Sequence, residues 1–499
     1  MPNYIQYYDN LYGYIDFEKG LYDKILKDPF FLRLHNLRQM GLAYQVFPDA
    51  LHTRFAHSIG VYAIVTKMID AQKRFCSPSI IDGKEKDKIM ISALLHDIGH
   101  LPLSHTIELA LEEYEQELLT FEKQQDELFS DGESPKEDSQ DTKAPTSDAV
   151  DKPALHEMLG EYVLQASNIS TYLSERGISP LEISSGFKGD IAYAQKEELE
   201  KGTFYNKQIR NFLHSQFDAD RIDYLLRDSS FSGVKTGGFD LDKLLNSIYY
   251  GNNIEYGVDE SAIRAIEQFF MSRFVAYCQI VGNRRVMAFG YMAKDFYYRL
   301  LKSRDKVEDI LGKKLYSYRD LIYRVLINNP EEFLEFTDEY FFLLVREVLK
   351  KKSTIGSVDP IITKYAEMIT YGIPLSAVTY FEAFDPLIEP CFIESLSSNT
   401  DLKNEIANKL GMTSDDIIIP APMKVKIYQG AKDAIQVFSK GRLLHSDVSN
   451  SPASILNYLK DKVLKIYRIY TFDESRVDEL RTELAAKAKS YRYPGDLVS

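Results

Sequence analysis

Apolar side chains recur every three or four residues in two stretches of the first hundred residues, which is the spacing of helices that bury one face. The stretch 55–76 predicts a helix whose buried face is formed by Val61, Ile64, Val65, Met68 and Ile69. The stretch 86–100 predicts a second, more apolar helix. Gly99 and Pro102 end or break that helix just where polar residues appear.

Helical signals continue on both sides of these two stretches. Residues 28–41 predict a helix, because Pro29 stands just inside its start and Gly41 just past its end. The chain from 155 to 330 has a mostly helical pattern, with a looser stretch near 185–205. Helices are therefore expected to dominate the first two thirds of the chain.

The pattern changes after about residue 415. Runs rich in β-branched and aromatic residues predict strands at 423–429, 434–440 and 463–472. Helix-like segments lie between and after them, at 451–462 and 475–490. We therefore expect a mainly α fold, with a helical core and a small C-terminal α+β appendage. The predicted domains are the core, a helical extension and the appendage, over 1–330, 331–414 and 415–499.

An acidic insertion interrupts the predicted core at about 120–153. Its first part has the pattern of a charged helix, and from about Ser130 it contains almost no large apolar residue. Such a composition cannot offset the entropy lost on ordering, so we expect a disordered loop. A tolerated surface insertion is the favoured interpretation, and an acidic lid or a partner-binding segment is the alternative.

Composition narrows the classes of function. The net charge of the 499 residues is −14, which does not favour a general role in binding nucleic acid or other polyanions. No apolar run approaches the roughly 20 residues that span a bilayer, and the three cysteines form no closely spaced pair. We expect a cytoplasmic protein that has no membrane partner.

Histidine and aspartate provide the candidate chemistry. His57 lies in HTRFAHSIG, the pair His96-Asp97 in LLHDIGH, and Asp220 in FDADRIDYLLRD. Imidazole and carboxylate together suit manganese, iron, nickel or zinc better than calcium or magnesium. Such an ion polarises a phosphoryl oxygen and activates water at neutral pH. His96 and Asp97 can reach the same ion if they lie at the end of a helix, which Gly99 provides.

The flanking residues match one known family in order. The matching segments are RQMGLAYQVFPDALHTRFAHSIGVY (38–62), ALLHDIGHLPLSH (93–105), ALHE (154–157) and FDADRIDYLLRDS (217–229). In these segments the chain resembles the HD-domain phosphohydrolases, in the branch of the deoxynucleoside triphosphate triphosphohydrolases. The resemblance covers the N-terminal half of the chain. It implies a helical HD core and one divalent transition metal held by His57, His96, Asp97 and Asp220.

The resemblance also implies catalytic and substrate-binding residues. In related enzymes the histidines at the positions of His100, His105 and His156 line the phosphate site and transfer protons, and Glu108 stands where those enzymes carry a catalytic acid. Their alternative role is to orient neighbouring groups. The implied substrate contacts are Arg54, Arg221 and Arg273 to phosphate, Tyr224 and Asp228 to the sugar, and Gln39 to the 3′-hydroxyl.

The chain departs from the family pattern at two places. Val281 stands where deoxy-selective relatives carry a tyrosine against the sugar, so rejection of a ribose hydroxyl is expected to be weaker. The guanine-reading activator residues of the family fall at Lys27, Leu32 and His35, which does not favour activation by a guanine nucleotide.

These observations predict a metal-dependent hydrolase that releases triphosphate from deoxynucleoside triphosphates, with magnesium as a second ion on the substrate phosphates. One alternative is a phosphohydrolase of ribonucleotides or of a signalling nucleotide, which Val281 favours. Another is a nucleotide-sensing assembly subunit. Relatives form dimers or tetramers, so the resemblance also predicts a homo-oligomer.

Overall fold

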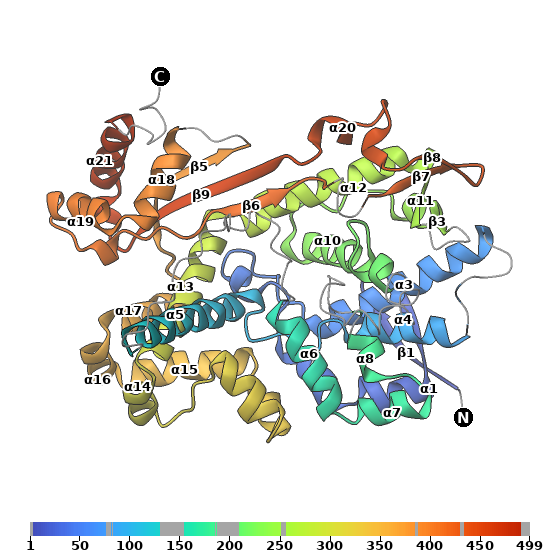
Figure 1. The fold of residues 1–499 in the computed structure, drawn as a ribbon, viewed down its shortest axis with the longest axis horizontal. Coiled ribbons are helices and arrows are strands. Elements are labelled where there is room, and N and C mark those ends of the chain that lie inside the picture. The colour runs from blue at the N-terminus through green and yellow to red at the C-terminus, as the bar shows by residue number, and fades with distance from the viewer. Residues whose placement is uncertain are drawn as a thin grey trace, which may run out of the picture.

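The computed structural model of the chain describes residues 3–75, 81, 83–129, 154–184, 186, 209–250, 256–384, 388–429 and 434–490. The fold is mainly helical, with small sheets that include the C-terminal strands (Figure 1), as the sequence predicts. The helices nearest the candidate site are α3 (Arg54–Phe75), α4 (Gly83–Leu95), α5 (His105–Phe129), α6 (Leu155–Ala166), α10 (Ala219–Ser232), α12 (Ile263–Ala276) and α13 (Arg284–Lys302).

Helix α3 confirms the first hydrophobic pattern. Its five predicted core residues are all buried, and the helix packs against α4 and α10. Helix α4 ends at Leu95, so His96 and Asp97 lie in the turn that follows it. The side chains of these two residues are therefore not held 100° apart as on a continuous helix.

The prediction of a single helix over 28–41 is wrong, because the observed helix is much shorter. Only α2 (Pro29–Leu32) is α-helical, and a tighter 3₁₀ turn follows at Arg33–Asn36. The Arg33 side chain is buried and donates hydrogen bonds to the backbone carbonyls of His100 and Phe336, at 2.6 and 2.7 Å. This tertiary contact fixes the segment in a position that a regular amphipathic helix would not provide.

Helix α5 extends to Phe129 and confirms the charged helix predicted for the first part of the acidic insertion. Within the predicted insertion at 120–153, the expectation of disorder therefore applies only from Ser130 onward. The predicted disordered segment at 130–153 lies outside the described residues, as does most of the looser stretch near 185–205.

The C-terminal strands form two sheets with earlier parts of the chain. In one, β9 (Val463–Thr471) pairs antiparallel with β6 (Met423–Lys426) and with β5 (Ser376–Ala383). In the other, the order is β3 (Ile248–Tyr250), β4 (Tyr256–Asp259), β7 (Gln436–Ser439) and β8 (Arg442–His445), with β4 and β7 parallel. The predicted extension at 331–414 thus contains a strand. The domain boundaries stay predictions, and the pairing of β4 with β7 and of β5 with β9 crosses them.

Strand β9 also contacts the segment that precedes α13. Arg468 is buried and donates a hydrogen bond to the carbonyl of Gly282 at 3.0 Å, and the Tyr470 hydroxyl donates to the carbonyl of Arg284 at 2.8 Å. Gly282 directly follows a π-helical turn, η6 (Tyr277–Val281). The C-terminal sheet therefore fixes the position of this turn.

The remaining elements surround the core (Figure 1). A hairpin of β1 and β2 opens the chain, and helices α14–α17 lie beside α5 and α13. These elements are β1 (Tyr4–Asp9), β2 (Gly13–Glu18), α1 (Lys19–Leu21), α7 (Ile169–Glu175), α8 (Pro180–Ser184), α11 (Leu241–Leu245), α14 (Arg304–Leu311), α15 (Asp338–Lys350), α16 (Lys352–Val358), α17 (Pro360–Tyr371), α18 (Ile388–Ser398), α19 (Thr400–Lys409), α20 (Leu456–Leu459) and α21 (Val477–Ser490).

Two C-terminal helix predictions have different outcomes. Helix α21 confirms the segment at 475–490, whereas only α20 forms within 451–462, because the chain leaves the helical conformation at Lys460 and Asp461 has a φ of 60°. Of the helices that the structure describes, none has the length and apolar character needed to cross a bilayer.

Candidate metal and phosphate site

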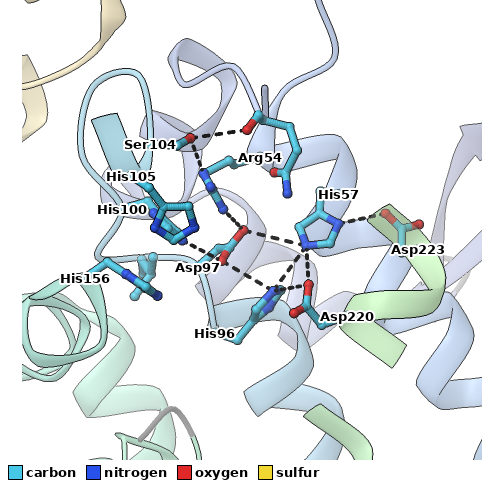
Figure 2. A network of polar contacts seen from close by, with 12 residues as sticks. Arg54, His57, His96, Asp97, His100, Ser104, His105, His156, Asp220 and Asp223 are labelled. Carbon is cyan, nitrogen blue, oxygen red and sulfur yellow. Dashed lines mark hydrogen bonds and ion pairs between the residues drawn. The ribbon is translucent and has the colours of Figure 1, made fainter. Parts of the chain in front are cut away.

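The four predicted metal ligands come together from three elements (Figure 2). His57 lies on α3, His96 and Asp97 in the turn after α4, and Asp220 on α10. The His57 Nε2 atom is 3.3 Å from His96 Nε2 and 3.0 Å from Asp220 Oδ1. Asp97 reaches the same place, with Oδ2 3.7 Å from His57 Nε2 and Oδ1 3.4 Å from His96 Nε2. The donor atoms of His57, His96 and Asp97 all lie within 4.8 Å of one another.

The electrostatics of this cluster favour a cation at its centre. Burial lowers the pKa of His57, but Asp220 and Asp223 outweigh burial and raise it to about 10. Burial likewise opposes ionisation of Asp97, yet Arg54 and the neighbouring histidines hold its pKa well below the usual range. The ionised carboxylates of this cluster therefore stabilise a positive charge placed between them and the two imidazoles. A divalent ion fits both this charge and the donor types.

Asp223, on α10, is a further residue of the site. Its carboxylate does pair with Arg227, at 2.9 and 3.0 Å, but Oδ2 also accepts a hydrogen bond from His57 Nδ1 at 2.8 Å. This bond fixes the imidazole tautomer that leaves Nε2 open toward the other ligands. The His57 ring thus has one nitrogen for orientation and one for a metal.

Gly60 allows this arrangement. A Cβ at position 60 would lie 1.9 Å from Asp223 Oδ1 and 2.4 Å from Arg227 Nη2. Helix α10 can therefore bring its buried ion pair against α3 only because residue 60 has no side chain.

Arg54 lies beside the ligands, as its position three residues before His57 predicts. Its Nη1 donates to Asp97 Oδ2 at 2.5 Å, and its Nε donates to the Ser104 hydroxyl at 2.9 Å. The guanidinium is buried and borders a cavity of about 350 Å³. A planar guanidinium in this position can bind two oxygens of a phosphate group.

The predicted catalytic residues form a second cluster, centred on Glu108. Its carboxylate accepts hydrogen bonds from His105 Nδ1 at 2.9 Å and from His156 Nδ1 at 3.0 Å. The His156 ring stacks on the His100 ring, with centroids 3.9 Å apart. Two ring nitrogens are therefore engaged by one carboxylate, which leaves the Nε2 atoms of His105 and His156 for other partners.

Titration behaviour suits proton handling in this cluster. Burial alone would raise the pKa of Glu108, but the hydrogen bonds from His105 and His156 lower it, so the carboxylate is ionised at neutral pH. Burial lowers the pKa of both His100 and His156. His105 is 65% exposed and borders the cavity. An exposed imidazole whose other nitrogen faces an ionised carboxylate can donate a proton to a leaving group and be reprotonated by solvent.

The cavity also reaches most of the predicted substrate contacts. Gln39, Arg221, Tyr224 and Asp228 all line it, together with the candidate metal ligands His96, Asp97 and Asp220. The Gln39 Oε1 atom is buried and has no hydrogen-bond partner among the described residues. A buried acceptor without a partner costs free energy, so a donor on a bound ligand would complete it.

Three of the predicted substrate-binding residues, Arg221, Asp228 and Arg273, already have hydrogen-bond or ion-pair partners within the protein. Arg221 pairs with Asp218, the N-cap residue of α10, and Asp228 Oδ1 lies 2.8 Å from His52 Nε2. Arg273 is not among the residues that line the cavity, and its Nη2 donates to the carbonyl of Lys426 at 3.1 Å. The phosphate role of Arg273 stays a prediction.

His214 and Tyr277 are among the residues of the cavity wall that sequence reasoning missed. Burial lowers the pKa of His214 to about 3, and its Nε2 has no hydrogen-bond partner in the part of the chain that is described. His214 stands just before the FDADRID motif, which is a signal that could have identified it. Tyr277 lies on the π-helical turn η6, whose irregular backbone has no clear sequence pattern.

A second cavity, of about 780 Å³, adjoins the first. The two share Gln39, His105, Asp228 and Val281 in their walls. The additional residues are largely apolar and include Met40, Leu109, Val286, Met287 and Met423. A ligand whose phosphates lie beside Arg54 could therefore extend past Gln39 and Val281 into an apolar space.

Comparison with known proteins agrees with this geometry. Residues 54–225 match the family model of the HD domain. The uncharacterized protein YwfO of Bacillus subtilis is 29% identical over 272 residues, which are 54% of this chain and 50% of that protein. The deoxynucleoside triphosphate triphosphohydrolase SAMHD1 of Xenopus laevis is 37% identical over 97 residues, 19% of this chain and 15% of that protein. The chain spans about half the length of the first of these curated relatives.

Two solved structures share the fold over nearly the whole chain. A hypothetical protein from Aquifex aeolicus superposes with a TM-score of 0.65 at 23% identity, covering 96% of this chain and all of that one. A phosphohydrolase from Bacteroides thetaiotaomicron superposes with a TM-score of 0.63 at 20% identity, covering 94% of this chain and all of that one. Together with the match at 54–225, which contains His57, His96, Asp97 and Asp220, the observed geometry identifies this part of the chain as an HD domain.

Proposed function

We propose that the protein is a metal-dependent HD-domain phosphohydrolase that converts deoxynucleoside triphosphates to deoxynucleoside and triphosphate. One observation carries the proposal: a single cavity is lined by three of the four candidate metal ligands, by Arg54 and Arg221, and by His105 and His156, the two histidines that hydrogen-bond Glu108. The same cavity is lined by Gln39, whose Oε1 has no hydrogen-bond partner among the described residues. The partial similarity to a protein named as a deoxynucleoside triphosphate triphosphohydrolase supports the same substrate class.

His57, His96, Asp97 and Asp220 would hold the ion, which when bound supplies positive charge to a phosphoryl oxygen and lowers the pKa of water. Manganese, iron, nickel and zinc all fit this donor set. Arg54 and Arg221 would bind the phosphate oxygens of the substrate. A second ion, magnesium, would travel with the substrate phosphates.

The proposed reaction breaks the bond between the α-phosphorus and the 5′-oxygen, and water supplies the new oxygen on phosphorus. His105 would donate a proton from Nε2 to the departing 5′-oxygen, while Glu108 holds the proton on Nδ1. Gln39 Oε1 would accept a hydrogen bond from the 3′-hydroxyl, with Tyr224 and Asp228 beside the sugar.

A panel of the four deoxy- and four ribonucleoside triphosphates, incubated with manganese and the protein, tests this proposal. Ion-exchange chromatography of the products should show nucleoside and intact triphosphate in equal amounts. Glu108→Gln is the matched control, because it leaves the four candidate ligands in place, and it should slow turnover by about 10²–10⁴-fold. Stepwise release of orthophosphate would contradict the proposed bond cleavage. Nucleotide binding without turnover would instead support the sensing alternative.

Val281 motivates a ribonucleotide alternative. The side chain is 43% exposed and lines both cavities. We expect measurable hydrolysis of at least one ribonucleoside triphosphate, and a greater preference for deoxynucleotides in Val281→Tyr. A steric contact of this size discriminates by about 10–200-fold. The ratio of kcat/KM for matched deoxy and ribo substrates measures the effect, and strict rejection of ribonucleotides by both proteins would contradict it.

A further inference from the structure

The backbone just before α5 has a conformation that residues with a side chain rarely adopt. Leu103 and Ser104 are consecutive and have φ of 52° and 58°. This left-handed region is unfavourable for residues with a Cβ, and two in succession persist only where surrounding contacts hold them. Gly41, itself at a φ of 53°, lies so close that a Cβ there would be 3.2 Å from the Leu103 carbonyl oxygen. The segment is therefore fixed by its neighbours rather than by local preference.

Asp338, the first residue of α15, supplies the holding contacts. Its buried carboxylate accepts a hydrogen bond from the Leu103 amide at 2.8 Å through Oδ1. The other oxygen, Oδ2, accepts from the Arg38 amide at 3.0 Å. These two amides are 235 and 300 residues away from Asp338 in sequence. One carboxylate thus joins the segment before α5 to the segment that carries Gln39.

Ser104 connects these backbone segments to the Arg54 side chain by hydrogen bonds. Its hydroxyl accepts a hydrogen bond from Arg54 Nε at 2.9 Å (Figure 2). The same hydroxyl donates to the Arg38 carbonyl at 3.1 Å. Since Asp97 holds Nη1, the guanidinium is fixed at two of its nitrogens, and Nη2 has no hydrogen-bond partner among the described residues. The plane of the guanidinium is therefore set before any ligand arrives.

We propose that Ser104 and Asp338 are positioning residues that pre-orient Arg54 for the polyphosphate of the substrate, and Gln39 with it. This inference rests on the proposed function for the identity of the ligand. Its physical basis is preorganisation: a side chain that is already held in its binding geometry loses little conformational freedom when it binds. The Ser104 hydroxyl is engaged by Arg38 and Arg54, and Asp338 lines neither cavity, so each residue acts through the side chain or backbone that it holds.

The test uses the full-length, metal-loaded protein and inorganic tripolyphosphate as the probe, with binding measured by calorimetry. Ser104→Ala removes the hydroxyl and keeps the backbone. Asp338→Asn keeps the size of the side chain but presents an NH₂ group to one of the two amides, which then loses its acceptor. The matched controls are Ser92→Ala, which removes a buried hydroxyl that has no partner in the described chain, and Asp447→Asn, which changes a buried acceptor in the C-terminal region.

We expect Ser104→Ala and Asp338→Asn to weaken tripolyphosphate binding by about tenfold, because a hydrogen bond to a charged group is lost or misaligned. Metal content should be unchanged, and the two controls should bind as the wild type does. For any nucleotide that is hydrolysed, KM should rise with the same factor. Affinity within twofold of the wild type in both variants, even with a lower melting temperature, would overturn the inference and leave a purely structural role.

The outcome is separable from the proposed function. If the wild type hydrolyses no nucleoside triphosphate, the proposed function fails, while the tripolyphosphate affinities of the four variants still decide whether Arg54 is pre-oriented. If nucleotides are hydrolysed but neither Ser104→Ala nor Asp338→Asn changes affinity or KM, the positioning inference alone fails.

Discussion

Replacing both His96 and Asp97 by alanine is expected to remove the bound transition metal and abolish hydrolysis. The two residues provide two of the four candidate ligands, and the Nε2 of His96 lies 3.3 Å from that of His57. The remaining His57 and Asp220 could hold an ion only weakly, because each lost ligand opens a coordination position to water. Metal analysis of the purified variant, together with a hydrolysis assay, measures both effects.

This variant needs a folding control. Removal of the Asp97 carboxylate leaves the buried Arg54 guanidinium without its acid partner, which typically costs about 3–5 kcal/mol of stability. Circular dichroism should establish that the double variant is folded. His96→Gln provides a second variant that leaves the Arg54–Asp97 pair intact and should also lose metal affinity. A folded double variant with one ion per chain would show that the ligand assignment is wrong.

Gly60→Ala is expected to lower both stability and metal affinity, although residue 60 is not one of the candidate ligands. The new methyl group would lie 1.9 Å from Asp223 Oδ1 and 2.4 Å from Arg227 Nη2, so the buried ion pair or α10 must move. Overpacking costs about 1–3 kcal/mol, and separation of a buried ion pair adds to this. We expect the free energy of unfolding to fall by about 3 kcal/mol. Metal affinity should fall by about 10–100-fold, because Asp223 no longer orients His57.

Gly290→Ala is the matched control for this prediction. Gly290 lies within α13, and a Cβ there would meet nothing within 4 Å. Alanine at such a helical position should stabilise the protein by up to about 1 kcal/mol. Urea unfolding of both variants, with metal titrations, gives the comparison. Equal stability of Gly60→Ala and the wild type would mean that α3 and α10 are not in the close contact described here.

The elements that sequence predicts well are those governed by local pattern. Helix α3 has apolar residues at helical spacing, begins one residue before the predicted start and continues to Phe75, the last described residue of this segment. The ligand cluster was also predictable, because His57, His96, Asp97 and Asp220 lie in motifs with a family order. In both cases the determining information lies within a few residues of the feature.

The features that sequence missed depend on distant partners. Strand β5 lies in a segment predicted as helical, and its position is set by pairing with β9 about 90 residues later in the chain. Asp223 could be predicted to pair with Arg227 on the same helix, but its bond to His57 depends on how α10 approaches α3. The local pattern of residues 28–41 predicts one helix, because it contains no sign that the Arg33 side chain binds the carbonyl of His100.

The contacts of β9 with the turn before α13 mean that the cavity wall and the candidate metal ligands are positioned by different parts of the chain. Val281 and Tyr277 form a wall of the cavity, yet Arg468 and Tyr470, which fix the end of that turn, belong to a sheet remote from the metal ligands in sequence. Substitutions at Arg468 or Tyr470 are therefore expected to change the shape of this cavity wall from a distance, without removing any of the candidate metal ligands.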